Sequence, residues 1–132
     1  MIERQPLSGH RIVEAAVAVA DRGGLTAVSM RNVGRELGVE AMSLYHHVAS
    51  KEALLDDLAD WIFTGIELPD EHEPWREGMV KRATSAREVL ASHPWALGLI
   101  ESRSTPGRAL MRHHNAVIGC LRGSKFPVPL AS

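Results

Sequence analysis

Apolar residues recur every three or four positions along most of the chain, which is the spacing of a helix with one buried face. The first such run contains Ile12, Ala16 and Val19. Ser8 precedes it and is a residue type favoured at helix N-caps, while the glycines of DRGG follow it and are typical of a helix end. The pattern therefore predicts an amphipathic first helix.

A short second helix and a third follow without a long connection. Ser29 is suited to cap the second helix, and Gly38 is suited to end it. The third is expected to run from Glu40 to Val48. Two short helices joined by three or four residues that include a glycine have the geometry of a helix-turn-helix, whose second member enters the major groove of DNA.

The third segment has an unusual outer face. Val39, Leu44 and Val48 are spaced to pack inward. The outward positions are then Ala41, Met42, Ser43, Tyr45 and His47. Small residues allow close approach to base edges, and hydroxyl, imidazole and methyl groups suit contacts to bases and phosphates. The alternative interpretation is that these are ordinary solvated side chains.

A fourth, longer helix begins directly afterwards and is expected to extend to about Ile66. Ser50 is its expected N-cap, and Lys51 stands in its first turn, where the helix dipole disfavours a cation. A phosphate bound at this helix end would turn that penalty into an attraction. Glu52 offers a local explanation instead, because its charge partly compensates the dipole.

The remaining sequence also predicts helices. ELPDEHEP, residues 67–74, is expected to be a loop, and a helix of about 18 residues follows from Trp75, with Pro74 at its start. A short helix in PWALGLIESR comes next, and another covers 108–122. The core candidates in that last helix are Leu110, Ala116, Val117, Cys120 and Leu121. The fold class predicted from these patterns is all-α.

Composition narrows the classes of function. The 132 residues, 45% of them hydrophobic, have the profile of a globular protein able to bury a core. A net charge of -1 argues against a general polyanion binder, so a nucleic-acid role requires individually positioned contacts. The single cysteine, the lack of a secretory signal and the lack of a membrane span predict a cytoplasmic protein that does not contact membranes.

Nothing in the sequence indicates catalysis, a cofactor or a metal site. No nucleophile elbow or glycine-rich phosphate loop is present. His113 and His114 are adjacent on an expected helix, where neighbours point about 100° apart and cannot easily share one ion. We therefore expect a protein that is not an enzyme.

The stretch from Ser8 to about Asp60, including RELGV and LYHHVASKEALL, resembles the DNA-binding domain of tetracycline-repressor (TetR) family transcriptional regulators. A weaker similarity to the family's ligand-binding domain continues through WREGMVKRATSAREVLASHPWALGLIESR and the helix after it. The resemblance implies four parts: a three-helix head with the helix-turn-helix over 1–50, a connecting helix over 51–66, a partial ligand-binding domain over 67–122 and an irregular tail over 123–132.

The resemblance also implies sites. DNA contacts would come from Ser29, Arg31, Ala41, Met42, Ser43, Tyr45, His47 and Lys51. In the most similar branch Gln and Pro often stand at the places of Ala41 and Met42. Because Ala and Met cannot make the bidentate contact of a Gln with adenine, the resemblance does not imply which operator sequence is read. An effector pocket would be lined by Trp61, Trp75, Met79, Trp95 and Leu99, although such residues at helical spacing also serve as plain core.

The function implied is a repressor that reads a palindromic operator in double-stranded DNA and is released by a small-molecule effector. The family acts as a homodimer, and this chain stops before the helices that would form the dimer, so it looks truncated. An alternative from another class remains open: a helical module that binds small molecules or proteins and does not bind DNA.

Overall fold

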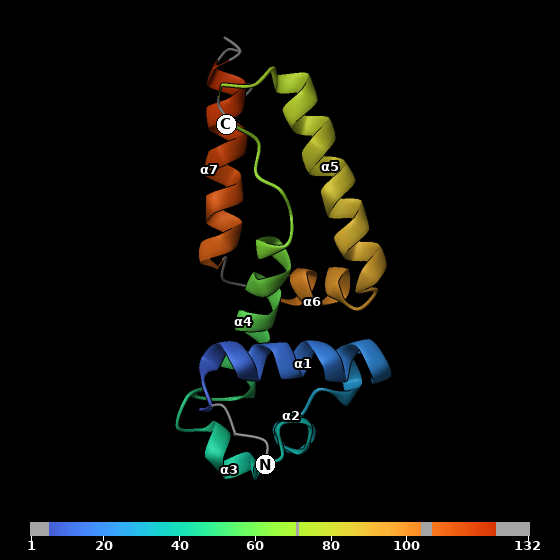
Figure 1. Cartoon of the computed structure of the whole chain (residues 1–132), viewed down its shortest axis with the longest axis vertical. Helices are drawn as coiled ribbons and strands as arrows, with labels where there is room; N and C mark the ends of the chain where they lie inside the picture. The colour runs from blue at the N-terminus through green and yellow to red at the C-terminus, as the bar shows by residue number, and fades with distance from the viewer. Residues whose placement is uncertain (1–5, 71, 104–106, 124–132) are drawn as a thin grey trace. The chain divides into compact units, whose positions relative to one another are not determined.

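The computed structural model describes residues 6–70, 72–103 and 107–123. In these ranges it contains seven α-helices, one 3-10 turn and no strand, so the predicted all-α class is confirmed (Figure 1). The chain divides into two compact units, residues 1–58 and 59–132. Helix α4 (Lys51–Thr64) begins in the first unit and ends in the second.

The first unit holds α1 (Gly9–Gly23), the turn η1 (Leu25–Ala27), α2 (Met30–Leu37) and α3 (Ala41–Leu44), together with the start of α4. Helix α1 packs on α2, and α2 packs on α3. The fully buried apolar side chains here are Ile12, Ala16, Val28, Val33, Leu44, Leu54 and Leu58. Apart from Val28, which follows the turn η1, these residues recur at helical spacing, so one face of each helix forms the core.

Serine and glycine fix the ends of the helices in this unit, as the sequence predicts. The side-chain oxygens of Ser8, Ser29 and Ser50 each accept a hydrogen bond from the backbone amide three residues later, at 3.2, 3.0 and 3.1 Å. Gly38 ends α2 in the left-handed conformation, with φ of 73°, which a residue without Cβ adopts at little cost.

The predicted third helix, Glu40 to Val48, is too long. Helix α3 covers only Ala41–Leu44, and a turn follows it. In that turn the amides of Tyr45 and His47 donate to carbonyls three residues earlier, at 3.3 and 2.9 Å, which is the tighter 3-10 pattern. Val48 is buried, so the chain returns to the core instead of continuing an exposed helix.

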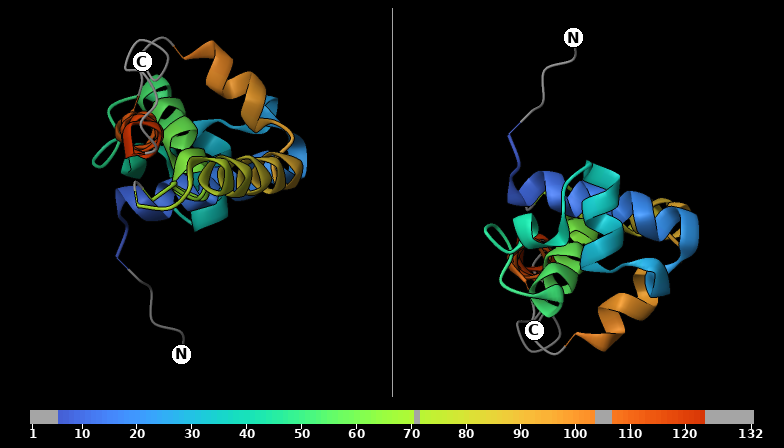
Figure 2. Two further views of the ribbon diagram at one scale, coloured as in Figure 1. Left: turned by 90° about the horizontal axis from the view of Figure 1, so that it is seen from above. Right: turned by 90° about the horizontal axis from the view of Figure 1, so that it is seen from below.

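The second unit contains the end of α4, then α5 (Trp75–Ser92), α6 (Ala96–Ser102) and α7 (Arg108–Gly123). Helices α5 and α7 contact each other and run in opposite directions (Figure 1). Figure 2 shows α7 nearly end-on, with α6 at a steep angle to it. No helix of the described ranges is long and apolar enough to cross a membrane.

Burial in the second unit differs from the pattern predicted for its last helix. Cys120 is buried as predicted, but Leu110, Ala116, Val117 and Leu121 are only half-buried. One polar side chain of this unit, His113, is fully buried. The other fully buried side chains are Ile62, Ala96, Leu99 and Cys120. The predicted tail, 123–132, lies outside the described residues except for its first glycine, which ends α7.

Candidate nucleic-acid interface

The angle between α2 and α3 depends on Gly34, a buried residue inside α2. A Cβ atom there would lie 2.8 Å from the carbonyl oxygen of Val39 and 3.3 Å from the amide nitrogen of Ala41. The amide of Val39 donates a hydrogen bond to the Gly34 carbonyl at 2.9 Å, which holds the turn between α2 and α3 against α2. Sequence reasoning missed Gly34, although a glycine inside a helical run is a signal of close backbone approach.

The side chains predicted to face outward lie on α3 and on the turn after it. Met42 is 73% exposed and Tyr45 46%, and His47 is also exposed. Ala41 and Ser43 are half-buried. The structure therefore groups an aromatic ring, an imidazole and a thioether on one short exposed segment. That these residues contact DNA stays a prediction.

Two other residues that the family resemblance predicts to contact DNA, Ser29 and Arg31, lie at the start of α2. Arg31 is exposed in the first turn of α2, next to the N-cap Ser29. The Ser29 oxygen accepts from the Asn32 amide, which leaves its hydroxyl hydrogen able to donate to a phosphate. The Asn32 side chain in turn donates to the carbonyl of Ala27 at 2.8 Å and so fixes the preceding turn η1 against α2.

The N-terminus of α4 forms a further part of the surface. Lys51 is exposed in its first turn, next to the cap made by Ser50. Within the part of the chain that the structure describes, Lys51 takes part in no ion pair. A lysine beside the unsatisfied amides of a helix start is suited to bind one phosphate group.

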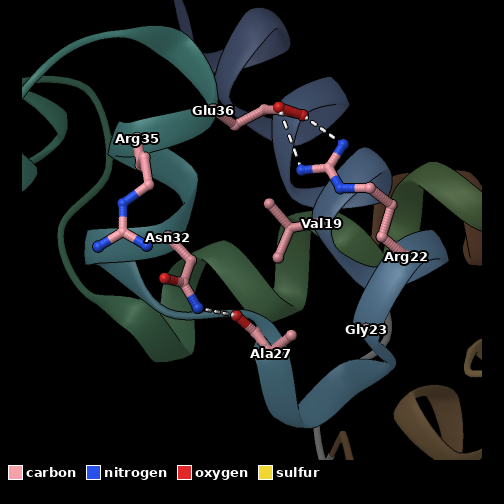
Figure 3. Close-up of a pocket in the computed structure, with 7 residues that line it drawn as sticks. All are labelled: Val19, Arg22, Gly23, Ala27, Asn32, Arg35 and Glu36. Carbon is pink, nitrogen blue, oxygen red and sulfur yellow. Dashed lines mark hydrogen bonds and ion pairs between the residues drawn. The ribbon is translucent and has the colours of Figure 1, made fainter.

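A hollow of about 500 Å³ lies beside α2, lined by Val19, Arg22, Gly23, Ala27, Asn32, Arg35 and Glu36 (Figure 3). Across it the Arg22 guanidinium donates two hydrogen bonds to the Glu36 carboxylate, at 2.7 and 3.2 Å. This hydrogen bonding, more than any other cause, raises the pKa of Arg22 and lowers that of Glu36.

The same ion pair changes the charge on the outer face of α2. Glu36 is neutralised by Arg22, and Figure 3 shows Arg35 pointing away from that pair. Arg31 and Arg35 are both exposed and lie one turn apart on α2, and neither forms an ion pair with any described residue. The geometry thus makes Arg35 a further candidate for this surface.

The residues predicted to line an effector pocket fall into two groups in the second unit. Trp61 and Trp95 flank His93, with ring centroids 5.3 and 5.5 Å from it, and Leu99 is buried nearby in sequence. Trp75 and Met79 lie at the opposite end of α5, whose 18 residues span about 27 Å. The role of both groups in an effector pocket stays a prediction.

Residues 12–58 match the model of a family described as "Bacterial regulatory proteins, tetR family". The chain is 37% identical over 118 residues to the HTH-type transcriptional repressor DrrR1 of Streptomyces coeruleorubidus, which covers 88% of this chain and 44% of that protein. The chain spans about half the length of the curated relatives it matches.

Solved structures agree with the sequence match. The TetR family protein ActR of Streptomyces coelicolor, in complex with (S)-DNPA, has a TM-score of 0.81 and 31% identity, covering 96% of this chain and 63% of ActR. BioQ with its double-stranded DNA operator has a TM-score of 0.80 and 25% identity, covering 96% and 77%. The matched segment contains the helix-turn-helix described above, and the chain belongs to the TetR family of bacterial regulatory proteins.

Proposed function

We propose that the protein is a transcriptional repressor that reads a palindromic DNA operator through α2, α3 and the start of α4, and that a small-molecule effector releases it. The observation that carries this proposal is the exposure of Arg31 at the start of α2, Tyr45 at the end of α3 and Lys51 at the start of α4. All three side chains are exposed, and serine caps fix the starts of α2 and α4, which carry Arg31 and Lys51.

Each residue has a distinct task in this proposal. Tyr45, His47 and Met42 face the base edges, where a ring and a thioether can contact a thymine methyl and the polar atoms can hydrogen-bond. Arg31 can donate two hydrogen bonds to a guanine. Lys51 and the amides at the start of α4 hold a phosphate and so fix the register of the protein on the duplex.

Four further positions contribute to the proposed DNA-binding surface. Ser29 and Ser43 can donate hydroxyl hydrogens to the sugar-phosphate backbone, and the small side chain of Ala41 lets α3 approach the groove. Arg35 adds a second cation on the face of α2 that carries Arg31. Its neighbour Glu36 does not oppose a phosphate there, because the Arg22 guanidinium already binds that carboxylate.

Regulation and symmetry follow from the family. Three relatives support the proposed cycle. DrrR1 is named a transcriptional repressor, BioQ was solved with its DNA operator, and ActR was solved with a small molecule. A homodimer would place two heads on half-sites about 34 Å apart, which is one helical turn of DNA. The effector would contact the Trp61, Trp95 and Leu99 group or the Trp75 and Met79 group. Such a protein acts in the cytoplasm, where bacterial DNA lies.

Selection of binding sites from a random duplex pool at low salt, together with the mass of the protein in solution, tests the proposal. Enrichment of an inverted repeat by a dimer is the expected result. Enrichment of a single half-site by a monomer would support DNA reading and refute the dimer. If a helical, folded protein enriched no sequence and showed no salt-dependent binding, the alternative of a helical module without DNA binding would replace the proposal.

A further inference from the structure

An acidic residue, Glu36, lies on α2 together with two exposed arginines, Arg31 and Arg35. Five residues of α-helix span about 7.5 Å, which is the separation along the axis between Arg31 and Glu36. This separation is shorter than the Debye length of about 10 Å at 0.1 M salt. An uncompensated carboxylate on Glu36 would therefore repel a phosphate bound at Arg31.

The compensating cation comes from a different helix. Arg22, in the last turn of α1, donates two hydrogen bonds to the Glu36 carboxylate, at 2.7 and 3.2 Å, across 14 positions of sequence. Two hydrogen bonds from one guanidinium fix the orientation of a carboxylate as well as offsetting its charge. The hydrogen bond to Arg22 is also the largest cause that lowers the pKa of Glu36. The carboxylate is thus ionised at neutral pH, and Arg22 holds it in one place.

The backbone on both sides of this ion pair is anchored on the turn η1. On the α1 side, a Cβ atom at Gly23 would lie 2.8 Å from the Cβ of Ala27, so the end of α1 lies directly against the turn. On the α2 side, the Asn32 side chain donates to the Ala27 carbonyl at 2.8 Å. Figure 3 shows Arg22 and Glu36 meeting at the hollow that these residues also line. The guanidinium is therefore presented to the carboxylate from a fixed frame.

The arginines of α2 are left to attract an anion. Arg35 lines the same hollow and points away from the ion pair in Figure 3. We propose that Arg22 is a positioning residue for DNA binding: it neutralises Glu36 and holds its carboxylate at α1, so that Arg31 and Arg35 attract phosphates without an opposing anion. This inference rests on the proposed function, and it adds a residue of α1 that lies outside the positions implied by the family resemblance.

A structural role alone is the alternative for this pair. In that case Arg22 and Glu36 only join α1 to α2, and removing either partner disturbs the DNA-binding head in the same way. The Arg22 side chain is 64% exposed, so solvent screens the pair and its contribution to stability is small. The two roles differ in sign: an electrostatic role makes the two single substitutions act oppositely on DNA affinity, and a structural role makes them act alike.

Fluorescence anisotropy with a labelled duplex of about 20 base pairs and random sequence measures this difference, because attraction to phosphates does not depend on sequence. At about 50 mM salt, Arg22→Gln exposes the Glu36 charge and should weaken binding about two- to fivefold, the range for one charge within a Debye length. Glu36→Gln leaves Arg22 as an added cation and should strengthen binding by a similar factor. The double variant should bind like the unmodified chain.

Matched controls separate this pair from the total charge of the protein. Arg87→Gln and Glu88→Gln make the same charge changes at exposed positions of α5 and should leave affinity unchanged. Arg22→Lys keeps the cation and should bind more tightly than Arg22→Gln. Raising the salt from about 50 to about 200 mM should narrow the differences between the variants.

Circular dichroism confirms that each variant is folded. If Arg22→Gln does not fold, the direction of the Glu36→Gln effect decides, because a structural role predicts weaker binding and the proposed role predicts stronger binding. Loss of the ion pair is common to both single variants, so a change in stability does not produce their opposite effects on DNA affinity.

Three results would overturn the inference. Weaker binding by both single variants, with no recovery in the double variant, would show that the pair only joins two helices. Effects equal to those of Arg87→Gln and Glu88→Gln would show that Arg22 acts only through total charge. Either result with DNA binding by the unmodified chain would contradict this inference alone. If the unmodified, folded chain bound no duplex at low salt, both this inference and the proposed function would be wrong.

Discussion

Asp60 on α4 caps the N-terminus of α7: its Oδ1 accepts a hydrogen bond from the backbone amide of Ala109 at 2.7 Å, across 49 positions of sequence. The first amides of a helix have no partner inside the helix, and a carboxylate there also interacts favourably with the helix dipole. Gly107 precedes α7 beside this cap, and a Cβ atom at Gly107 would collide with the Asp60 carboxylate. The cap therefore joins α4 to α7 in the second unit.

Removing this cap should destabilise the fold. We expect Asp60→Ala to lower the free energy of unfolding by about 1–2 kcal/mol, the range of a lost N-cap, and Asp60→Asn to lose less because its amide oxygen still accepts. Urea unfolding followed by circular dichroism measures both. Glu88→Ala, at an exposed position on α5, serves as control and should change stability by less than about 0.5 kcal/mol. An Asp60→Ala effect no larger than the control would show that the cap contributes nothing.

Stability should fall on mild acidification because of His113. Its pKa is lowered in the fold, chiefly by burial, with the charges of Arg82 and Arg112 adding to the effect. The unfolded chain therefore binds a proton more readily, so stability is full above the ordinary value of 6.5 and declines as pH falls below it. Thermal unfolding between pH 8 and pH 5 should show this decline, and His113→Gln should flatten it. His114→Gln, exposed on the same helix, should keep it; identical pH profiles for all three proteins would refute this assignment.

Two glycines in helices should respond oppositely to alanine. Gly34→Ala places a methyl group 2.8 Å from the Val39 carbonyl and should cost about 1–3 kcal/mol as the turn between α2 and α3 is pushed apart. Gly9→Ala at the start of α1 meets no atom within 4 Å and should be neutral or stabilising, because alanine is the better helix former. Chemical unfolding of the two variants checks the contrast. A Gly34→Ala protein as stable as Gly9→Ala would mean that the turn does not need the close approach.

The Arg22–Glu36 pair should make the first unit sensitive to acid. The pKa of Glu36 is lowered, first by its hydrogen bond to Arg22, so the contribution of the pair is full above the ordinary carboxyl value of 4.5 and is lost as pH falls through the lowered one. Glu36→Gln should therefore reduce the thermal midpoint at pH 7 and have a smaller effect near pH 3. High salt should narrow the difference at pH 7, since the pair is exposed. An effect of the substitution that stays constant with pH would contradict this view.

Local signals in the sequence predicted much of the first unit. Helix spacing placed the core, and the residue types at Ser8, Ser29 and Gly38 identified the ends of α1 and α2, because caps depend on neighbours in sequence. The length of α3 could not be predicted in the same way. Exposed Tyr45 and His47 are compatible with either a helix or a 3-10 turn, and the burial of Val48 decides between them.

The second unit was less predictable because its decisive contacts are distant in sequence. The cap on α7 comes from Asp60, and the partner of His113 is the Phe63 carbonyl, 50 positions away. The sequence argues only against a shared metal ion at His113 and His114, and the contact of His113 with the Phe63 carbonyl at the end of α4 shows that His113 is core. The apolar spacing of Leu110, Ala116 and Val117 indicated the wrong face as most buried.

The salt dependence of DNA binding tests the central claim most directly. The operator fragment enriched by selection is titrated with the unmodified chain, with Lys51→Ala and with Lys81→Ala between about 50 and 200 mM salt. Lys81 is a matched control, since it already pairs with Glu73 at 3.3 Å in the second unit. The account predicts that Lys51→Ala lowers affinity for all sequences and reduces the slope of log K against log salt by about one unit, while Lys81→Ala changes neither. A slope for Lys51→Ala equal to that of the unmodified chain would show that the start of α4 holds no phosphate, and the proposed DNA-reading surface would be wrong.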